Sequence, residues 1–118
     1  MLIWDELEFV ECLEVVPTVE EYEVSHHFCV QEDGLTLKLT VFQYDGDVYI
    51  SVYKDGVEIP ILDVKLLACS GVRRVNDKRG DYLEFAPAKA FGSRYDGSSA
   101  IPLGIRLSVR PSISVELF

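Results

Sequence analysis

At 118 residues the chain has the length of one domain, and its contents of 48% hydrophobic and 26% charged residues are ordinary for a soluble protein. Its formal net charge of −9 argues against nonspecific binding to nucleic acid or to anionic lipid. No apolar run approaches the ~20 residues of a membrane span, so we expect a single β domain over residues 1–118, with no nucleic-acid or membrane partner.

The charges are distributed unevenly along the chain. Residues 1–64 carry fifteen acids and two bases, whereas residues 65–118 carry nine bases and five acids. Charge asymmetry of this kind influences the choice of partner and the rate of association rather than the fold. The asymmetry therefore predicts an acidic face on the folded protein.

The N-terminal segment places an acid at every third position. On a helix over residues 5–16 these acids form one stripe opposite an apolar face, and Pro17 would end the helix. On a strand, which is the alternative, two of the four acids would face the core. The acids are Asp5, Glu8, Glu11 and Glu14.

The middle of the chain has the alternating pattern of antiparallel strands. Apolar residues occupy every second position in residues 35–41 and 48–52. Three Asp-Gly pairs, at 33–34, 45–46 and 55–56, favour type I′ hairpin turns. The pattern predicts a four-stranded meander near 22–32, 35–44, 47–54 and 57–68. Because proline cannot donate to a ladder, Pro60 makes the fourth strand an edge, or a bulged or broken strand.

The second half continues with short strands. Arg79-Gly80 indicates a turn between strands near 69–76 and 81–86, and two more strands flank Pro111. Seven to eight short strands predict a mainly β fold, an antiparallel β-sandwich or flattened barrel, with one N-terminal helix.

The histidines and cysteines give no catalytic or metal site. On a strand over 22–32, His26 shares the inner side with Tyr22 and Val24, whereas His27 shares the outer side with Cys29. A Cys29–His27 nucleophile pair lacks any nearby oxyanion-hole motif. We therefore expect no enzyme, no metal and no cofactor.

The cysteines and the N-terminus bear on the location of the protein. Three widely spaced cysteines do not form a disulfide framework, and the first residues lack the pattern of a secretory signal. The expected location is the cytoplasm. The cysteines are Cys12, Cys29 and Cys69.

A long segment without strand pattern, 87–104, separates the two groups of C-terminal strands. Loops of this length are commonly functional, and aromatic and arginine residues are enriched at binding hot spots. Its candidate contact residues are Phe91, Arg94, Tyr95 and Asp96. Nearby, Arg73 and Arg74 belong to a local basic cluster.

These features favour a non-catalytic protein-binding module, and one fitting role is a small acidic immunity or inhibitor protein that neutralises a basic partner. The alternative is a β domain that binds a sugar, lipid or nucleotide through the 87–104 loop, with Arg73 and Arg74. A homodimer through a strand edge, near Pro60 or in residues 113–118, is a third hypothesis. The predicted partner-binding acids are Asp5, Glu8, Glu11, Glu14, Glu20, Glu21 and Glu23.

Overall fold

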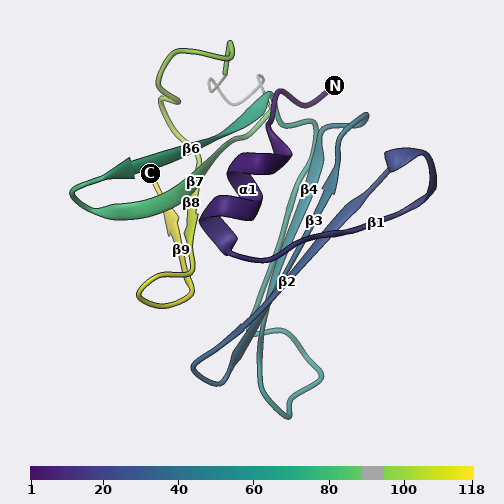
Figure 1. Ribbon diagram of the computed structural model, residues 1–118, viewed down its shortest axis with the longest axis vertical. Helices are drawn as coiled ribbons and strands as arrows, with labels where there is room; N and C mark the ends of the chain where they lie inside the picture. The colour runs from purple at the N-terminus through teal and green to yellow at the C-terminus, as the bar shows by residue number, and fades with distance from the viewer. Residues whose placement is uncertain (89–94) are drawn as a thin grey trace.

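The computed structural model describes residues 1–88 and 95–118, which form two antiparallel sheets and one α-helix (Figure 1). The first sheet has the strand order β1-β2-β3-β4-β5, and the second has the order β6-β7-β8-β9. The elements are α1 (Glu6–Leu13), β1 (Thr18–Val19), the 3₁₀ turn η1 (Glu21–Glu23), β2 (His26–Glu32), β3 (Leu35–Phe42), β4 (Asp47–Lys54), β5 (Leu62–Leu66), β6 (Gly71–Asp77), β7 (Gly80–Ala86), β8 (Ile105–Ser108) and β9 (Ser114–Leu117).

The predicted mainly β, antiparallel fold with an N-terminal helix is confirmed. All eight predicted strands occur among the described residues, and the two-residue strand β1 is added to them. The two sheets diverge from one another, and α1 lies between them (Figure 1). No helix in the described part of the chain is long and apolar enough to cross a membrane.

The helix is shorter than the predicted range 5–16. Asp5 caps its start, because its carboxylate oxygen Oδ1 accepts the backbone N–H of Leu7 at 2.9 Å. The helix ends at Leu13 because Glu14 adopts a left-handed conformation, with φ 58° and ψ 32°. Pro17 therefore lies beyond a helix that has already ended.

Only the first Asp-Gly pair forms the predicted type I′ turn. Asp33 and Gly34 both have positive φ, 51° and 79°, and they join β2 directly to β3. At the second pair only Gly46 is left-handed, and its N–H donates to the carbonyl of Phe42 at 2.9 Å in a longer turn.

Two of the predicted strands begin too early. The fourth strand of the meander was expected near residue 57, but β5 starts at Leu62, after Pro60, and forms an edge as expected. The first was expected near residue 22, but β2 starts at His26. His26 is buried as predicted, whereas Tyr22 and Val24 are exposed, because the chain turns through η1 before the strand begins.

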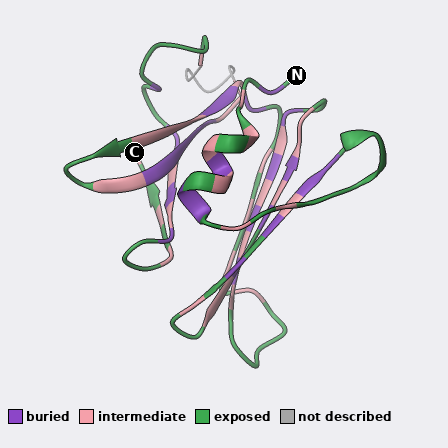
Figure 2. Cartoon of the chain, in the orientation of Figure 1, coloured by how far each residue is buried: buried purple, intermediate pink, exposed green. Residues whose placement is uncertain are grey.

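The core is formed by the inner faces of both sheets and by one face of α1, as the buried segments in Figure 2 show. Phe9 on α1 lies at the centre of this arrangement. Its ring lies 5.4 Å from that of Phe28 on β2 and 6.0 Å from that of Phe85 on β7. Phe9 therefore joins the helix to both sheets at once.

The three cysteines differ sharply in exposure. Cys12 and Cys69 are buried, and burial raises the pKa of each thiol to about 12, whereas Cys29 is exposed on β2. Because the thiolate is the reactive form, we expect a thiol reagent near neutral pH to modify one cysteine per native chain and all three in denaturant. Mass spectrometry of the modified peptides checks this. Rapid modification of Cys12 in the native protein would show that α1 opens readily.

Candidate partner-binding surface

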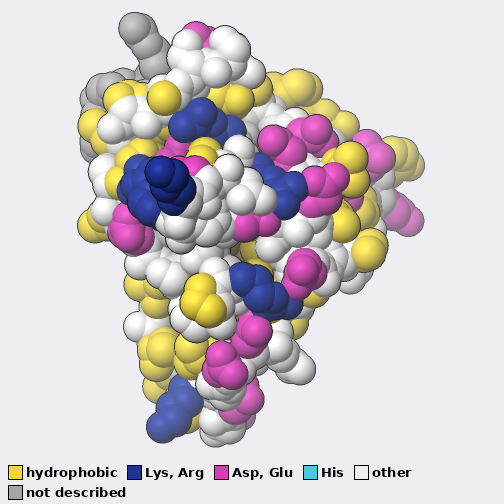
Figure 3. Space-filling view, turned by 60° about the vertical axis from the view of Figure 1, so that its left-hand side comes forward, with side chains coloured by type: hydrophobic (Ala, Val, Ile, Leu, Met, Phe, Trp, Pro, Cys, Tyr) yellow, Lys and Arg dark blue, Asp and Glu magenta, His cyan; other side chains and the backbone are white. Residues whose placement is uncertain are grey.

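The fold does not keep the acidic and basic halves of the sequence apart. Arg74 on β6 contacts Glu11 on α1, and Arg110 in the β8–β9 turn contacts both Glu14 and Glu32. Basic and acidic side chains are accordingly interspersed on the face shown in Figure 3. Two of the predicted partner-binding acids, Glu11 and Glu14, thus have cations of the same chain beside them.

The Arg74 side chain is the less exposed of these two cations. Its guanidinium donates to both carboxylate oxygens of Asp81, from Nε at 2.8 Å and from Nη2 at 2.7 Å. This forked hydrogen bond lowers the pKa of the Asp81 carboxyl below its usual range. On the neighbouring turn of α1, burial raises the pKa of Glu8.

Three other predicted acids, Glu20, Glu21 and Glu23, lie in one strained turn. We call residues 20–23, which also include Tyr22, the acidic turn. Tyr22 and Glu23 both have positive φ, 58° and 56°, which is costly for side chains other than glycine. The turn presents Tyr22 to solvent with 87% of its surface exposed. The strained backbone thus presents the aromatic ring of Tyr22 to solvent between acidic residues.

Hydrogen bonds connect the acidic turn to the start of α1. The side-chain amide of Gln43 donates to the carbonyl of Glu23 at 2.9 Å, and its oxygen accepts the indole N–H of Trp4 at 3.3 Å. The Trp4 ring packs against those of Phe9 and His26, with centroids 5.0 and 4.9 Å apart. This chain of contacts links the acidic turn to the segment that leads into α1.

Glu20 is held differently from its neighbours. Its carboxylate lies 3.1 Å from Nε2 of His27, which also contacts the hydroxyl of Ser25 at 3.1 Å. The hydrogen bond of Glu20 to His27 and, second, its hydrogen bond to Ser25 lower the pKa of its carboxyl group. The other ring nitrogen of His27 contacts the hydroxyl of Thr40 at 3.0 Å. The histidine on the outer face therefore fixes one end of the acidic turn.

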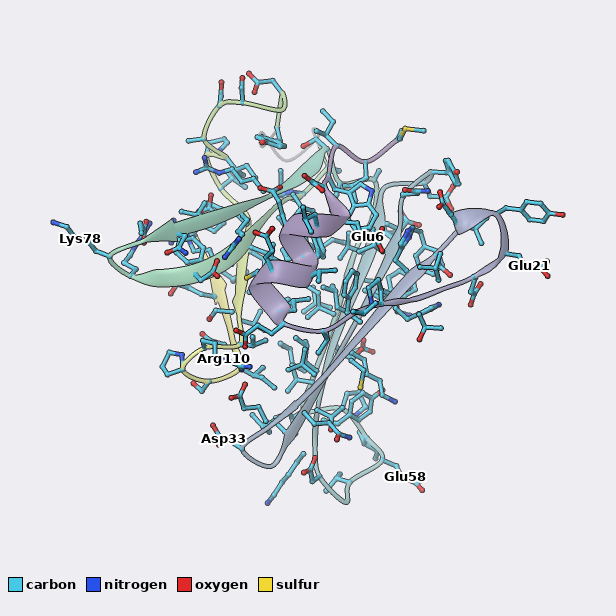
Figure 4. The ribbon with its side chains drawn as sticks, viewed as in Figure 1. Glu6, Glu21, Asp33, Glu58, Lys78 and Arg110 are labelled. Carbon is cyan, nitrogen blue, oxygen red and sulfur yellow. The ribbon has the colours of Figure 1, made fainter. Side chains whose placement is uncertain are left out.

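Glu6 and Tyr22 belong to this surface but were not among the predicted contacts. Glu6 is partly exposed in the first turn of α1, and Glu21 extends from the acidic turn at the edge of the molecule (Figure 4). Tyr22 was assigned to the inner side of a strand. The cluster of acids at 20, 21 and 23 is the signal that could have shown a turn there, because it breaks the apolar alternation.

The predicted contact loop is described only in part. Phe91 and Arg94 lie outside the described residues. The N–H of Tyr95 donates to the hydroxyl of Ser70 at 3.0 Å, and the carboxylate of Asp96 caps the following turn by accepting from the N–H of Ser99 at 2.7 Å. Backbone hydrogen bonds from Ser99 and Ser98 hold the pKa of Asp96 far below its usual range.

Arg73 and Arg74, the alternative ligand residues, point to opposite faces of β6. Arg73 donates from Nε to Glu84 at 2.9 Å, whereas Arg74 is directed toward α1. A pocket of about 400 Å³ lies beside Tyr95, but its described lining includes neither arginine. Among the described residues, Arg73 and Arg74 therefore do not line one common site.

A smaller pocket, of about 270 Å³, was not indicated by the sequence because its lining comes from three strands and two turns. It is lined by Arg79, Arg106 and Arg110 together with Tyr82 and serine hydroxyls. Arg79 donates to the phenol oxygen of Tyr82 at 2.6 Å. Within the described ranges, no group of three or more His, Cys, Asp or Glu side chains is placed to hold a metal ion.

Comparison with known proteins gives one informative similarity. No protein-family model and no curated protein matches the sequence. Among solved structures, the chain superposes on a chain of the "Contact-dependent growth inhibition toxin - immunity protein complex from Klebsiella pneumoniae 342" with a TM-score of 0.76 and 20% sequence identity. The match covers 99% of this chain and 96% of that chain. At this level of identity the similarity shows that the two chains share their fold.

Proposed function

We propose that the protein is an immunity protein, a non-catalytic protein that binds a toxin and neutralises it. The observation that carries the proposal is the shared fold, over nearly the whole of both chains, with a chain of a toxin–immunity protein complex. The net charge of −9 adds to it, because an acidic inhibitor associates rapidly with a basic enzyme and masks its substrate site.

The acidic turn and the first turn of α1 are our candidate contact surface for this partner. Tyr22 supplies a large exposed aromatic anchor, and tyrosines are enriched at binding hot spots. Glu21 and Glu23 flank it with negative charge. Glu11 and Glu14 contribute less in this proposal, because the guanidinium groups of Arg74 and Arg110 lie beside their carboxylates and partly offset their charges.

The first experiment identifies the partner and assigns the roles. The tagged chain is incubated with native lysate at low and at high salt, and bound proteins are identified by mass spectrometry. The captured protein is then expressed in a host, alone and together with this chain. We expect the partner alone to stop growth and co-expression to restore it. Growth arrest by this chain alone would instead give it the toxin's role and refute the proposal.

Reversing one charge in the acidic turn is expected to slow association with the captured partner. Glu21→Lys should lower the association rate constant at low salt by about three- to tenfold, because steering depends on charge near the docking surface. The difference should shrink at high salt, which screens exposed charges. Stopped-flow measurements over a salt series test both expectations.

Glu58→Lys is the matched control, since it changes the net charge by the same amount. Glu58 lies in the loop before β5, at the lower end of the molecule in Figure 4 and well away from Glu21. Equal slowing by the two variants would mean that only net charge matters. In that case the acidic turn would not be the contact surface.

A further inference from the structure

Among residues 1–88 and 95–118, no strand pairs with the outer side of β5, so the five-stranded sheet has an open edge there. β5 is the last strand of the order β1-β2-β3-β4-β5 and pairs with β4 on one side. An unpaired strand edge presents N–H and C=O groups that another strand can bind. In the second sheet, by contrast, Ile3 forms a parallel bridge to Gly71 at the outer side of β6.

The sequence around β5 is complementary to itself when it is read in the opposite direction. The heptapeptide 61–67 is Ile-Leu-Asp-Val-Lys-Leu-Leu, with Val64 at its centre. Asp63 and Lys65 are equidistant from Val64 and carry opposite charges. On each side of them the residues are aliphatic. Two copies of such a segment can therefore pair antiparallel without placing like charges opposite each other.

We propose that two copies of the chain form a dimer by pairing their β5 strands antiparallel about a two-fold axis at Val64. In this register Asp63 lies directly opposite Lys65 of the second copy, and Lys65 opposite Asp63. Opposite charges in directly facing positions stabilise an antiparallel pair. Because the axis duplicates every contact, the dimer contains two such pairs.

The same register covers apolar side chains that are exposed in the single chain. Ile61 is 62% exposed and Leu67 is 58% exposed, and each lies opposite the other across the axis, on the face that also carries the charges. On the inner face Leu62 lies opposite Leu66, and both are only partly buried in the single chain. The dimer thus removes from water an aliphatic surface on both faces of the joined sheet.

The surroundings of β5 suit this arrangement. Leu66 forms one wall of an apolar groove of about 420 Å³, whose other walls include Leu117 and Phe118 at the C-terminus. Leu62 of the second copy, placed opposite Leu66, lies at this groove. The groove therefore supplies apolar surface beyond the strand itself.

Within the part of the chain that the structure describes, the charges of β5 have only weak partners. Asp63 accepts the hydroxyl of Ser51 at 3.1 Å, and the ammonium of Lys65 lies 5.3 Å from the ring centre of Tyr49. Both side chains are exposed. They are thus available for the contact across the axis.

The edge strand β9 of the second sheet does not have this self-complementary charge pattern. An axis at Val115 places Glu116 opposite Ser114, and an axis at Glu116 places that carboxylate opposite its own copy. Glu116 is moreover paired with Arg106, at 2.9 Å, within the chain. Of the two strand edges that the sequence suggests for a homodimer, the charge pattern therefore favours β5.

Dimerisation through β5 does not depend on the immunity role. The acidic turn precedes β2, on the β1 side of the sheet, so that β5 lies at the opposite edge. Each copy in the dimer can thus present its own acidic turn. Loss of the dimer and loss of partner binding are separate outcomes.

The test is sedimentation equilibrium of the full chain over a concentration series, with charge-exchanged variants. Asp63→Lys and Lys65→Asp each create two like-charge contacts in the homodimer, and each should raise the dimer dissociation constant at least about tenfold. The double variant Asp63→Lys/Lys65→Asp restores opposite charges and should dimerise like the wild type. An equimolar mixture of the two single variants should form a heterodimer for the same reason.

A wild-type chain that stays monomeric at every concentration would overturn the proposal. Single variants that dimerise like the wild type would also overturn it. A folded double variant that fails to dimerise would overturn it as well. Circular dichroism checks that each variant is folded. Hydrogen exchange of the wild type needs no variant: the amides of residues 61–67 should be more protected at high than at low concentration, and equal protection would also refute the β5 dimer.

Discussion

Replacing Glu84 with alanine is expected to lower the free energy of unfolding by about 3 kcal/mol. Glu84 lies on β7 and is only 3% exposed. Its two carboxylate oxygens accept from Nε of Arg73 on β6, at 2.9 Å, and from Nε of Arg106 on β8, at 2.8 Å. Alanine leaves both guanidinium groups without their buried partner. The expected loss is at the lower end for a broken buried pair, because both arginines retain some contact with water.

Two further variants separate the ion pairs from simple loss of packing. Glu84→Gln keeps the shape of the side chain, but its amide nitrogen cannot accept from an arginine, so we expect about two-thirds of the loss, or ~2 kcal/mol. Glu116→Ala removes the exposed partner of Arg106 and should cost under about 1 kcal/mol. Urea denaturation of the three variants gives the comparison. If Glu84→Ala costs no more than Glu116→Ala, the buried carboxylate contributes little to stability.

The strand pattern was predictable because local signals and tertiary packing agree there. Alternation in residues 35–41 and 48–52 assigns β3 and β4, and the turn at Asp33-Gly34 fixes β2 as the second neighbour of β3. The errors lie at strand starts. In the sequence, the alternation of side chains that predicts a strand extends back from His26 to Tyr22. In the structure, the left-handed backbone of Tyr22 and Glu23 prevents a strand from forming there.

The candidate surface was less predictable than the fold. Its acids could be selected from charge alone, but ion pairs to Arg74 and Arg110 join residues that are 63 to 96 positions apart in the sequence. No local pattern contains such a contact, since it depends on how the second sheet is placed against α1. The exposure of Tyr22 was missed for the related reason that burial follows from the fold rather than from hydrophobicity.

The position of α1 between the sheets depends on Phe9, and Phe9→Ala is expected to lower the free energy of unfolding by about 4 kcal/mol. The ring is fully buried, with its edge contacts to Trp4 and Phe85 and its tilted contact to Phe28. The substitution leaves a cavity at the junction of three elements, where neither sheet can close without moving the other. Urea denaturation measures the loss.

Leu7→Ala is the control on the same helix. Leu7 is 59% exposed, and the contact that the helix cap needs is made by its backbone N–H, which alanine retains. Because both substitutions introduce alanine, helix propensity changes little at Leu7 and slightly favours the variant at Phe9. We expect Leu7→Ala to change stability by under about 0.5 kcal/mol. Similar losses in the two variants would mean that the helix adds stability through its own formation, and that the aromatic contacts of Phe9 do not hold the two sheets together.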